Sequence, residues 1–367
     1  IENLMIDKIQ IKGYKSIRDI TIKLNPINIL IGSNGVGKSN FISFFKLLYN
    51  VYEQRLQNYS LQQGANNLLH FGRKETDFIY GKLFFRDSLN SSDSNSYYFK
   101  LIPTEDNSLF IETEGSGYRA SWDNDTSDYF YVSDRKESHI KDSGSYRDKY
   151  LRYYFESFKI YHFHDTSSSA PLRSSCQIND NIILKENGSN LPAFLYYLQK
   201  RHQNNFKRIE KTINSIAPFF ERFELKPDRL NPEQIKLEWI EINQPDSYFN
   251  ATHFSDGTIR FIALCTLLMQ PNLPKTILID EPELGLHPVA IKKLAGIIRK
   301  ASAKTQVIIS TQSVTLVDNF DPNDIITVDR EENQSVFSKV NENNLTNWLE
   351  DYSLGDLWSK NVIKGQP

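Results

Sequence analysis

Short apolar runs separated by polar turns fill most of the chain and predict a mixed α/β protein. Apolar and polar residues alternate from residue 6 to 30 around turns at Gly13 and at residues 25–26, which predicts two strands. A continuous apolar run at 27–31 predicts a buried strand, and the apolar spacing after residue 38 predicts a helix. The first part of the chain is therefore predicted to end in a buried strand, a loop and a helix, in that order.

The middle of the chain first has an antiparallel pattern and then a helical one. Alternating segments separated by turn residues predict an antiparallel sheet formed by residues 78–85, 97–102 and 108–113. The polar stretch 115–147 predicts long loops, and 158–166 predicts a strand. Residues 190–223 have helical spacing, with no heptad run long enough for a long coiled coil. A further strand is expected around 235–242.

The last third predicts an apolar helix after residue 255 and buried parallel strands at 276–281 and 306–313, with a helix at 289–298 between them. Short β segments are expected at 325–328 and 336–340. We expect Met5 to be the natural start, with the four residues before it added.

The loop at 32–39 reads Gly-Ser-Asn-Gly-Val-Gly-Lys-Ser and fits G-x-x-x-x-G-K-[ST] between a predicted strand and a predicted helix. In such a loop, backbone N–H groups and the helix N-terminus attract phosphate oxygens. Lys38 would reach the β- and γ-phosphates, and the Ser39 hydroxyl would ligate Mg²⁺. We assign nucleotide binding to nine consecutive residues: Gly32, Ser33, Asn34, Gly35, Val36, Gly37, Lys38, Ser39 and Asn40.

The strand predicted at 276–281 ends in two adjacent carboxylates, Asp280 and Glu281, at the edge where parallel sheets present their chemistry. Asp280 would hold Mg²⁺ through water, and Glu281 would orient and deprotonate an attacking water. The strand at 306–313 ends in polar residues, including Gln312, that could contact the γ-phosphate. By itself, Ser255 at the start of the apolar helix is an N-cap.

Three other features have a structural and a functional interpretation. Lys15, on the turn before the phosphate loop, could approach a nucleotide or simply be solvated. His162, His164 and Asp165 could bind a metal, although no further ligand stands at a familiar spacing; otherwise they line the nucleotide region. The basic side of 190–223 could contact DNA or be a solvated face.

Composition limits the class of protein. The 367 residues include 39% hydrophobic ones, enough for a substantial core, and the net charge of −2 gives no overall attraction to nucleic acid. Two cysteines make no disulfide framework, which suits a reducing cytoplasm. No apolar run is long enough to span a membrane, so we expect a cytoplasmic protein with no membrane partner.

Taken in order, these motifs resemble the nucleotide-binding head of ATP-binding-cassette-type ATPases. Residues 32–39 match the Walker A motif, 276–281 Walker B and 310–313 the switch loop; 254–260 match the signature motif and 284–288 the D-loop. The resemblance lies in the branch holding structural-maintenance-of-chromosomes (SMC), RecF and OLD-type proteins, and most closely in compact bacterial AAA-family ATPases related to RecF, the AAA_21 type. It implies a P-loop NTPase fold: a mixed sheet with an antiparallel β layer and a helical insertion.

The resemblance also implies the division of the chain and its cofactors. Residues 1–367 would form a single head, with a Walker A and antiparallel β lobe at 1–165, a helical insertion at 166–253 and a signature and Walker B lobe with a tail at 254–367. ATP and Mg²⁺ are the implied cofactors. Ser255 and Gly257 would contact the nucleotide of a second head, so that two heads form a homodimer around two ATP molecules.

Two departures from the family pattern affect catalysis. Gln312 stands where the switch loop usually has histidine, and an amide cannot take a charge, so turnover should be slow. The glutamine expected after the central strand is absent, and His164 and Asp165 occupy the corresponding place.

Three functions fit this sequence. The first is an ATP-gated sensor or scaffold in bacterial antiviral defence; OLD-type relatives carry a Toprim nuclease, and because this chain ends soon after the switch loop, its effector would be a separate protein. The second is a RecF-like ATPase that binds DNA during repair. The third is a structural assembly module with little turnover.

Overall fold

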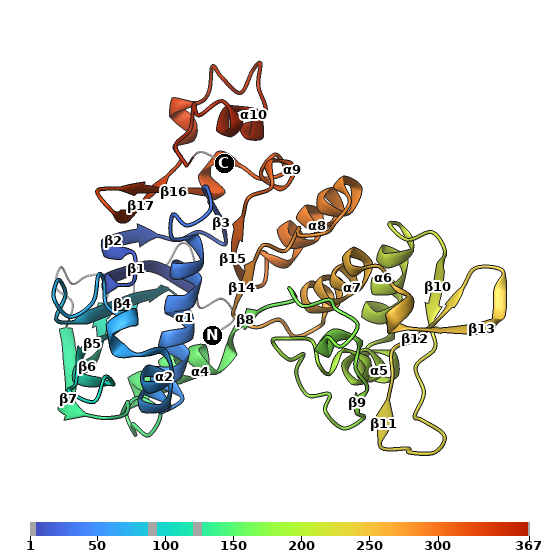
Figure 1. Ribbon diagram of the computed structural model, residues 1–367, viewed down its shortest axis with the longest axis horizontal. Coiled ribbons are helices and arrows are strands. Elements are labelled where there is room, and N and C mark those ends of the chain that lie inside the picture. The colour runs from blue at the N-terminus through green and yellow to red at the C-terminus, as the bar shows by residue number, and fades with distance from the viewer. Residues whose placement is uncertain (1–4, 87–93, 120–126, 366–367) are drawn as a thin grey trace. The chain divides into compact units, whose positions relative to one another are not determined.

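The computed structural model describes residues 5–86, 94–119 and 127–365, which divide into two compact units (Figure 1). Unit 1 comprises Ile1–Ile160, Pro274–Leu278 and Lys304–Pro367, and unit 2 comprises Tyr161–Leu273 and Ile279–Ala303. The four residues expected to precede the natural start lie outside the described part. The three lobes expected from the sequence stay a prediction.

Unit 1 contains an antiparallel sheet of six strands in the order β2-β1-β4-β5-β6-β7. Its strands are β1 (Met5–Tyr14), β2 (Ile17–Lys23), β4 (Ile79–Arg86), β5 (Ser94–Pro103), β6 (Leu109–Arg119) and β7 (Ser127–Arg135). Positions along β1 and β4 alternate between buried and less buried, and the buried ones are mostly apolar. This alternation is expected of a sheet with one covered face. The predicted antiparallel β layer is thereby confirmed.

A second sheet has the order β17-β16-β3-β15-β14-β8. Its strands are β3 (Ile27–Ile31), β8 (Phe158–Tyr161), β14 (Thr276–Asp280), β15 (Gln306–Thr311), β16 (Ile325–Glu331) and β17 (Gln334–Lys339). The central strand β3 is buried along its whole length and pairs in parallel with β15 and β16. This mixed sheet confirms the predicted fold class and places the end of β3 between two parallel neighbours.

Helix α1 (Lys38–Tyr52) packs between elements of both sheets in unit 1 (Figure 1). The ring of Phe44 stacks on Phe99 of β5 with centroids 6.0 Å apart, and the ring of Phe41 lies 5.5 Å from Phe337 of β17. The other helices of this unit are α2 (Leu56–Gln63), α3 (Ala65–Leu68), α4 (Tyr146–Ser157), α9 (Val314–Val317) and α10 (Leu354–Ser359), with short 3₁₀ turns at Pro322–Asp324 and Glu342–Asn344. The core thus holds the first half of the helix that follows the phosphate loop.

The C-terminal segment is anchored by Trp358 on α10. Its indole is fully buried and its Nε1 donates a hydrogen bond to the carbonyl of Gly365. We expect Trp358→Ala to lower the free energy of unfolding by about 3–5 kcal/mol, because it leaves a large cavity and an unpaired carbonyl. Urea unfolding followed by circular dichroism measures this change. Trp348→Ala, whose side chain is 46% exposed, is the matched control; equal losses for the two variants would contradict the assignment.

Unit 2 is built around helix α7 (Asp256–Met269), whose residues 259–268 are all buried. It packs against α6 (Gln203–Asn214) and α8 (Pro288–Ala301), and α6 also packs against α5 (Leu191–Arg201). Its small sheets contain β10 (Phe220–Phe223), β12 (Glu238–Glu241) and β13 (Gln244–Asn250), and separately β9 (Cys176–Gln177) with β11 (Gln234–Ile235); 3₁₀ turns lie at Pro171–Arg173 and Ala251–His253.

None of the helices in the described parts of the chain combines the length and apolar character needed to cross a bilayer. The longest described helix, α1, has 15 residues, so these parts contain no long coiled coil, as expected.

The prediction of loops over 115–147 was wrong for much of the stretch, although residues 136–145 do form a loop. Strand β6 continues to Arg119, β7 covers Ser127–Arg135 and α4 begins at Tyr146, while Trp122 lies outside the described residues. Two polar residues of β6 are buried and paired: Glu114 accepts hydrogen bonds from Tyr97 and Ser138, and Ser116 donates to Asp148. Buried polar groups that find partners are compatible with a strand, and a hydrophobic pattern does not reveal them.

Three boundaries also differ from the sequence prediction. The first hairpin turns at Lys15 and Ser16 rather than at Gly13, because β1 and β2 pair Tyr14 with Ile17 and Lys15 adopts a positive φ of 48°. The predicted strand at 158–166 ends at Tyr161, and the helical region at 190–223 ends at Asn214 before β10.

Candidate functional site

The phosphate loop lies in unit 1 between the buried strand β3 and the N-terminus of α1. Gly37, the N-cap of α1, has a φ of 117°, a backbone conformation that L side chains rarely adopt. A Cβ atom there would lie 2.0 Å from Ser335 Oγ and 2.7 Å from Ser16 Oγ. Glycine is therefore required at position 37 both for the turn and for the close approach of two neighbouring hairpins.

Lys38 folds back over this loop. Its Nζ donates hydrogen bonds to the carbonyl oxygens of Gly32, at 2.5 Å, and Ser33, at 2.8 Å, and the residue is only 5% exposed. The loop backbone thus holds the ammonium group beside the N-terminus of α1, whose dipole also favours anions. The two positive contributions converge where a phosphate would be bound.

Two serines that the sequence analysis did not single out support the loop. Ser335, on β17, donates from its Oγ to the carbonyl of Val36 at 2.5 Å, and this Oγ lies 2.6 Å from Ser16 Oγ. Asn40 donates from Nδ2 to the same Ser16 Oγ at 2.7 Å, so this residue of the predicted nucleotide set ties α1 to the hairpin turn. The partners of Ser335 lie about 300 residues away in sequence, and no local signal could have identified them.

Lys15 contacts both α1 and the segment at 68–70 in unit 1. The Lys15 ammonium donates to Ser43 Oγ at 3.1 Å, and burial, together with the charge of Lys46, lowers its pKa. The His70 Nδ1 atom lies 2.7 Å from the Lys15 carbonyl, and Lys15 N donates to the carbonyl of Leu68. The predicted turn lysine is therefore anchored to α1 rather than freely solvated.

The switch strand β15 brings Gln312 to the phosphate loop. Thr311 pairs with Ile31 across the parallel ladder, so the two strands end side by side. The Gln312 Nε2 atom donates to Asn34 Oδ1 at 2.6 Å, and Ser313 caps α9 by accepting from Leu316 N. Two predicted site residues distant in sequence, Asn34 and Gln312, thus meet in unit 1.

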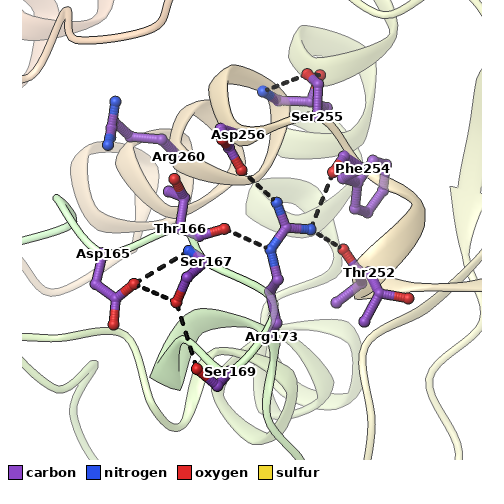
Figure 2. Close-up of polar contacts among 12 residues, drawn as sticks. Asp165, Thr166, Ser167, Ser169, Arg173, Thr252, Phe254, Ser255, Asp256 and Arg260 are labelled. Carbon is purple, nitrogen blue, oxygen red and sulfur yellow. Dashed lines mark hydrogen bonds and ion pairs between the residues drawn. The ribbon is translucent and has the colours of Figure 1, made fainter.

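The signature residues lie in unit 2 at the start of α7. Ser255 is the N-cap: its Oγ accepts from Thr258 N at 3.2 Å and lies 2.8 Å from Thr258 Oγ1 (Figure 2). Gly257 approaches the D-loop so closely that a Cβ atom would lie 2.3 Å from the Gly285 carbonyl oxygen. The structure therefore brings the signature motif and the D-loop together.

Glu281 follows β14 directly and has a φ of 42°, in the left-handed region. Pro282 comes next, and the carbonyl of Glu281 accepts from Leu284 N at 3.3 Å, which closes a tight turn. Left-handed backbone costs a residue other than glycine on the order of 1 kcal/mol or more and is concentrated at functional sites. The turn thus orients the Cα–Cβ bond of Glu281, the residue that follows Asp280 at the end of β14.

Arg260, which the sequence analysis named only as the end of the signature motif, links three segments of unit 2. It is 4% exposed, and its guanidinium donates to the carbonyl oxygens of Phe163 at 2.8 Å, His164 at 2.9 Å and Leu284. Burial lowers its pKa, while the nearby Asp256 and Glu283 act in the opposite direction. The available sequence signal was an arginine within an otherwise apolar helix.

The alternative metal site was wrong. Among the described residues, which include His162, His164 and Asp165, no group of three potential ligands is close enough to hold a metal. His164 contributes its carbonyl to Arg260, and Asp165 accepts from the Oγ and N of Ser167 at 2.7 and 3.1 Å, bonds that lower its pKa. These residues form a bonded turn instead.

Comparison with known proteins gives the family of the chain and its fold. A family scan matches residues 27–318 to AAA_21, described as "AAA domain, putative AbiEii toxin, Type IV TA system". The chain is similar to an Smc head bound to the C-winged helix domain of ScpA, at 16% identity and a TM-score of 0.57, with 93% of this chain and 99% of that chain covered. It is also similar to an Smc head domain with an extended coiled coil, bound to the C-terminal domain of ScpA, from Pyrococcus furiosus, at 15% identity and a TM-score of 0.56, with 95% and 99% covered. No curated protein matches the chain. The structural likenesses establish the Smc-head fold.

Proposed function

The chain belongs to the AAA_21 family, and from this membership we propose that it is an ATP-gated switch that binds and slowly hydrolyses ATP. The observation that carries the proposal is the phosphate loop, in which Lys38 lies against the carbonyls of Gly32 and Ser33 while Gln312 is bonded to Asn34. An ammonium group, a helix N-terminus and an amide donor then converge on one anion site.

In the proposed reaction, Glu281 accepts a proton from the attacking water as the bond between the γ-phosphorus and its bridging oxygen breaks, which yields ADP and phosphate. Lys38 neutralises charge on the β- and γ-phosphates. The Ser39 hydroxyl would ligate Mg²⁺ and Asp280 would hold it through water, and the ion would stabilise the negative charge of the phosphates. Because the Gln312 amide cannot take a charge, we expect slow turnover.

We further propose that ATP joins two heads. Ser255 and Gly257 at the N-terminus of α7 would contact the γ-phosphate bound by a second copy, so the homodimer would form with ATP and separate after hydrolysis. The exposed Leu284, on the D-loop beside Gly257, is consistent with a surface that becomes covered.

The biological role that we propose is a sensor or scaffold in bacterial antiviral defence, acting on a separate effector, a nuclease that could be of the Toprim type. The family description names a toxin of a toxin–antitoxin system, which by its name has a second component. The Smc heads of similar fold were each solved with a domain of ScpA bound, so this fold can hold a partner protein.

A DNA-repair role is the second candidate, favoured by one observation. Helix α6 exposes Lys207, Arg208 and Lys211 on one side, a cationic surface that could bind a DNA backbone. Salt-dependent binding of duplex DNA that is lost when all three become glutamine would favour this role over the defence role. A third candidate, the assembly module with little turnover, predicts no measurable ATPase activity.

The test of the switch is the mass of the Glu281→Gln protein by light scattering, with and without ATP and Mg²⁺. This change should retain binding and block water activation, so we expect the mass to double only with ATP. Lys38→Met in the same background is the control and should stay monomeric. An unchanged mass would contradict the proposed contact between Ser255 and the nucleotide bound by a second copy.

A further inference from the structure

Arg173 stands at the end of the 3₁₀ turn Pro171–Arg173 in unit 2, and its side chain is only 5% exposed (Figure 2). Every nitrogen of its guanidinium has an oxygen partner. Nε donates to the Thr166 carbonyl at 2.9 Å, Nη1 to the carbonyls of Ala251 and Phe254 at 2.5 and 2.9 Å, and Nη2 to Asp256 Oδ1 at 2.8 Å.

These contacts connect two segments that are far apart in sequence, 166–173 and 251–256, through bonds that span 78 to 83 residues. Thr166 lies in the turn closed by the Asp165–Ser167 bonds, Ala251 begins the 3₁₀ turn Ala251–His253, and Phe254 and Asp256 lie on either side of Ser255. A planar guanidinium with four of its five N–H donors engaged fixes both the distance and the orientation of its partners. The backbone before Ser255 and the carboxylate of the residue after it are therefore both held by the Arg173 side chain.

The same contact changes the charge beside Ser255. The Asp256 side chain is 68% exposed and lies in the first turn of α7, where a carboxylate stabilises the helix but would repel an arriving phosphate. The Arg173 guanidinium lies against this carboxylate from the buried side and offsets its charge. An anion approaching the N-terminus of α7 would then meet a neutral pair rather than a lone carboxylate.

We propose that Arg173 is a positioning residue that holds residues 251–256 in place and neutralises Asp256, so that Ser255 can engage a triphosphate. The positioning concerns unit 2 alone. The consequence for the triphosphate rests on the function proposed above.

Hydrogen exchange of the nucleotide-free protein tests the positioning, since it needs no ATP chemistry. We expect Arg173→Met to speed exchange of the amides at 254–259 at least tenfold, with other peptides of unit 2 changed less than twofold. Asp256→Asn keeps the three carbonyl contacts of Arg173, so the exchange rates of the same amides should change less than threefold. Arg222→Met, at an ion pair with Glu221 in which the Arg222 side chain is 47% exposed, is the matched control. Unchanged exchange in Arg173→Met would overturn the positioning.

ATP-driven association in the Glu281→Gln background tests the consequence. We expect Arg173→Met to raise the ATP concentration needed for half-association at least tenfold, while binding of a fluorescent ATP analogue to the monomer changes less than twofold. The double variant Arg173→Met/Asp256→Asn should need at least threefold less ATP for half-association than Arg173→Met, because the uncompensated carboxylate is gone.

The outcomes separate the two proposals. No recovery in the double variant would overturn the neutralising role. Association that is unaffected by Arg173→Met, despite faster exchange, would overturn the link to Ser255. If the Glu281→Gln protein itself never associates with ATP, the proposed function fails and the link to the triphosphate falls with it, whereas the exchange result still decides whether Arg173 positions the signature segment.

Discussion

Replacing Glu281 with glutamine is expected to lower the kcat for ATP hydrolysis at least 100-fold while changing ATP affinity less than threefold. Glu281 directly follows β14 and its backbone lies in the left-handed region, so the turn into Pro282 orients its Cα–Cβ bond. A positioned general base contributes about 10²–10⁴-fold to rate, and glutamine keeps the size of the side chain but cannot accept the proton.

Steady-state phosphate release and calorimetric ATP binding measure the two quantities separately. Glu221→Gln, at an exposed carboxylate of the same unit, is the control and should retain wild-type kcat. A kcat within fivefold of wild type for Glu281→Gln would mean that another group activates the water, and Glu281 would lose its assigned role.

Replacing Lys38 with methionine is expected to weaken ATP binding about 100-fold. The ammonium lies in the phosphate loop, held by the carbonyls of Gly32 and Ser33 beside the N-terminus of α1. A hydrogen bond to a charged group contributes about 1.5–3 kcal/mol, and removing the cation also leaves phosphate charge unbalanced in a site with low exposure. Methionine retains the length of the side chain without its charge.

Calorimetric titration with ATP and Mg²⁺ measures the loss, and circular dichroism verifies that the variant is folded. The matched control is Lys46→Met, at an exposed lysine on the same helix α1, for which we expect a change below threefold. Equal binding by Lys38→Met and wild type would show that this loop is not the nucleotide site.

The features that sequence reasoning predicted well are those determined over short distances. The strand, loop and helix around residues 32–39 are set by a fully apolar strand, by glycines at positions with positive φ and by the spacing of apolar residues on α1. Ser255 was expected to begin a helix, and its Oγ caps α7 through a residue only three positions away. Such local bonds depend on the residue types alone.

The errors arose where the interior is polar or where a turn depends on tertiary pairing. Strand β6 places Glu114 and Ser116 inside, which is tolerated because Tyr97, Ser138 and Asp148 pair with them. The first hairpin turns at Lys15, which has a positive φ that its residue type does not favour, since the register of β1 and β2 imposes it. No hydrophobic period encodes either outcome.

The sequence by itself therefore determined the fold class, the phosphate loop and the residues that carry the proposed chemistry, because motifs and hydrophobic periods are local. The tertiary structure alone decided which long-range hydrogen bonds hold these residues in place. Ser335 reaches Val36 and Ser16 across about 300 residues of sequence, Gln312 reaches Asn34, and Arg173 and Arg260 reach carbonyls about 80 to 100 residues away. A backbone carbonyl accepts a hydrogen bond whatever its side chain, so the partner of a buried arginine is chosen by the path of the folded chain and not by residue type.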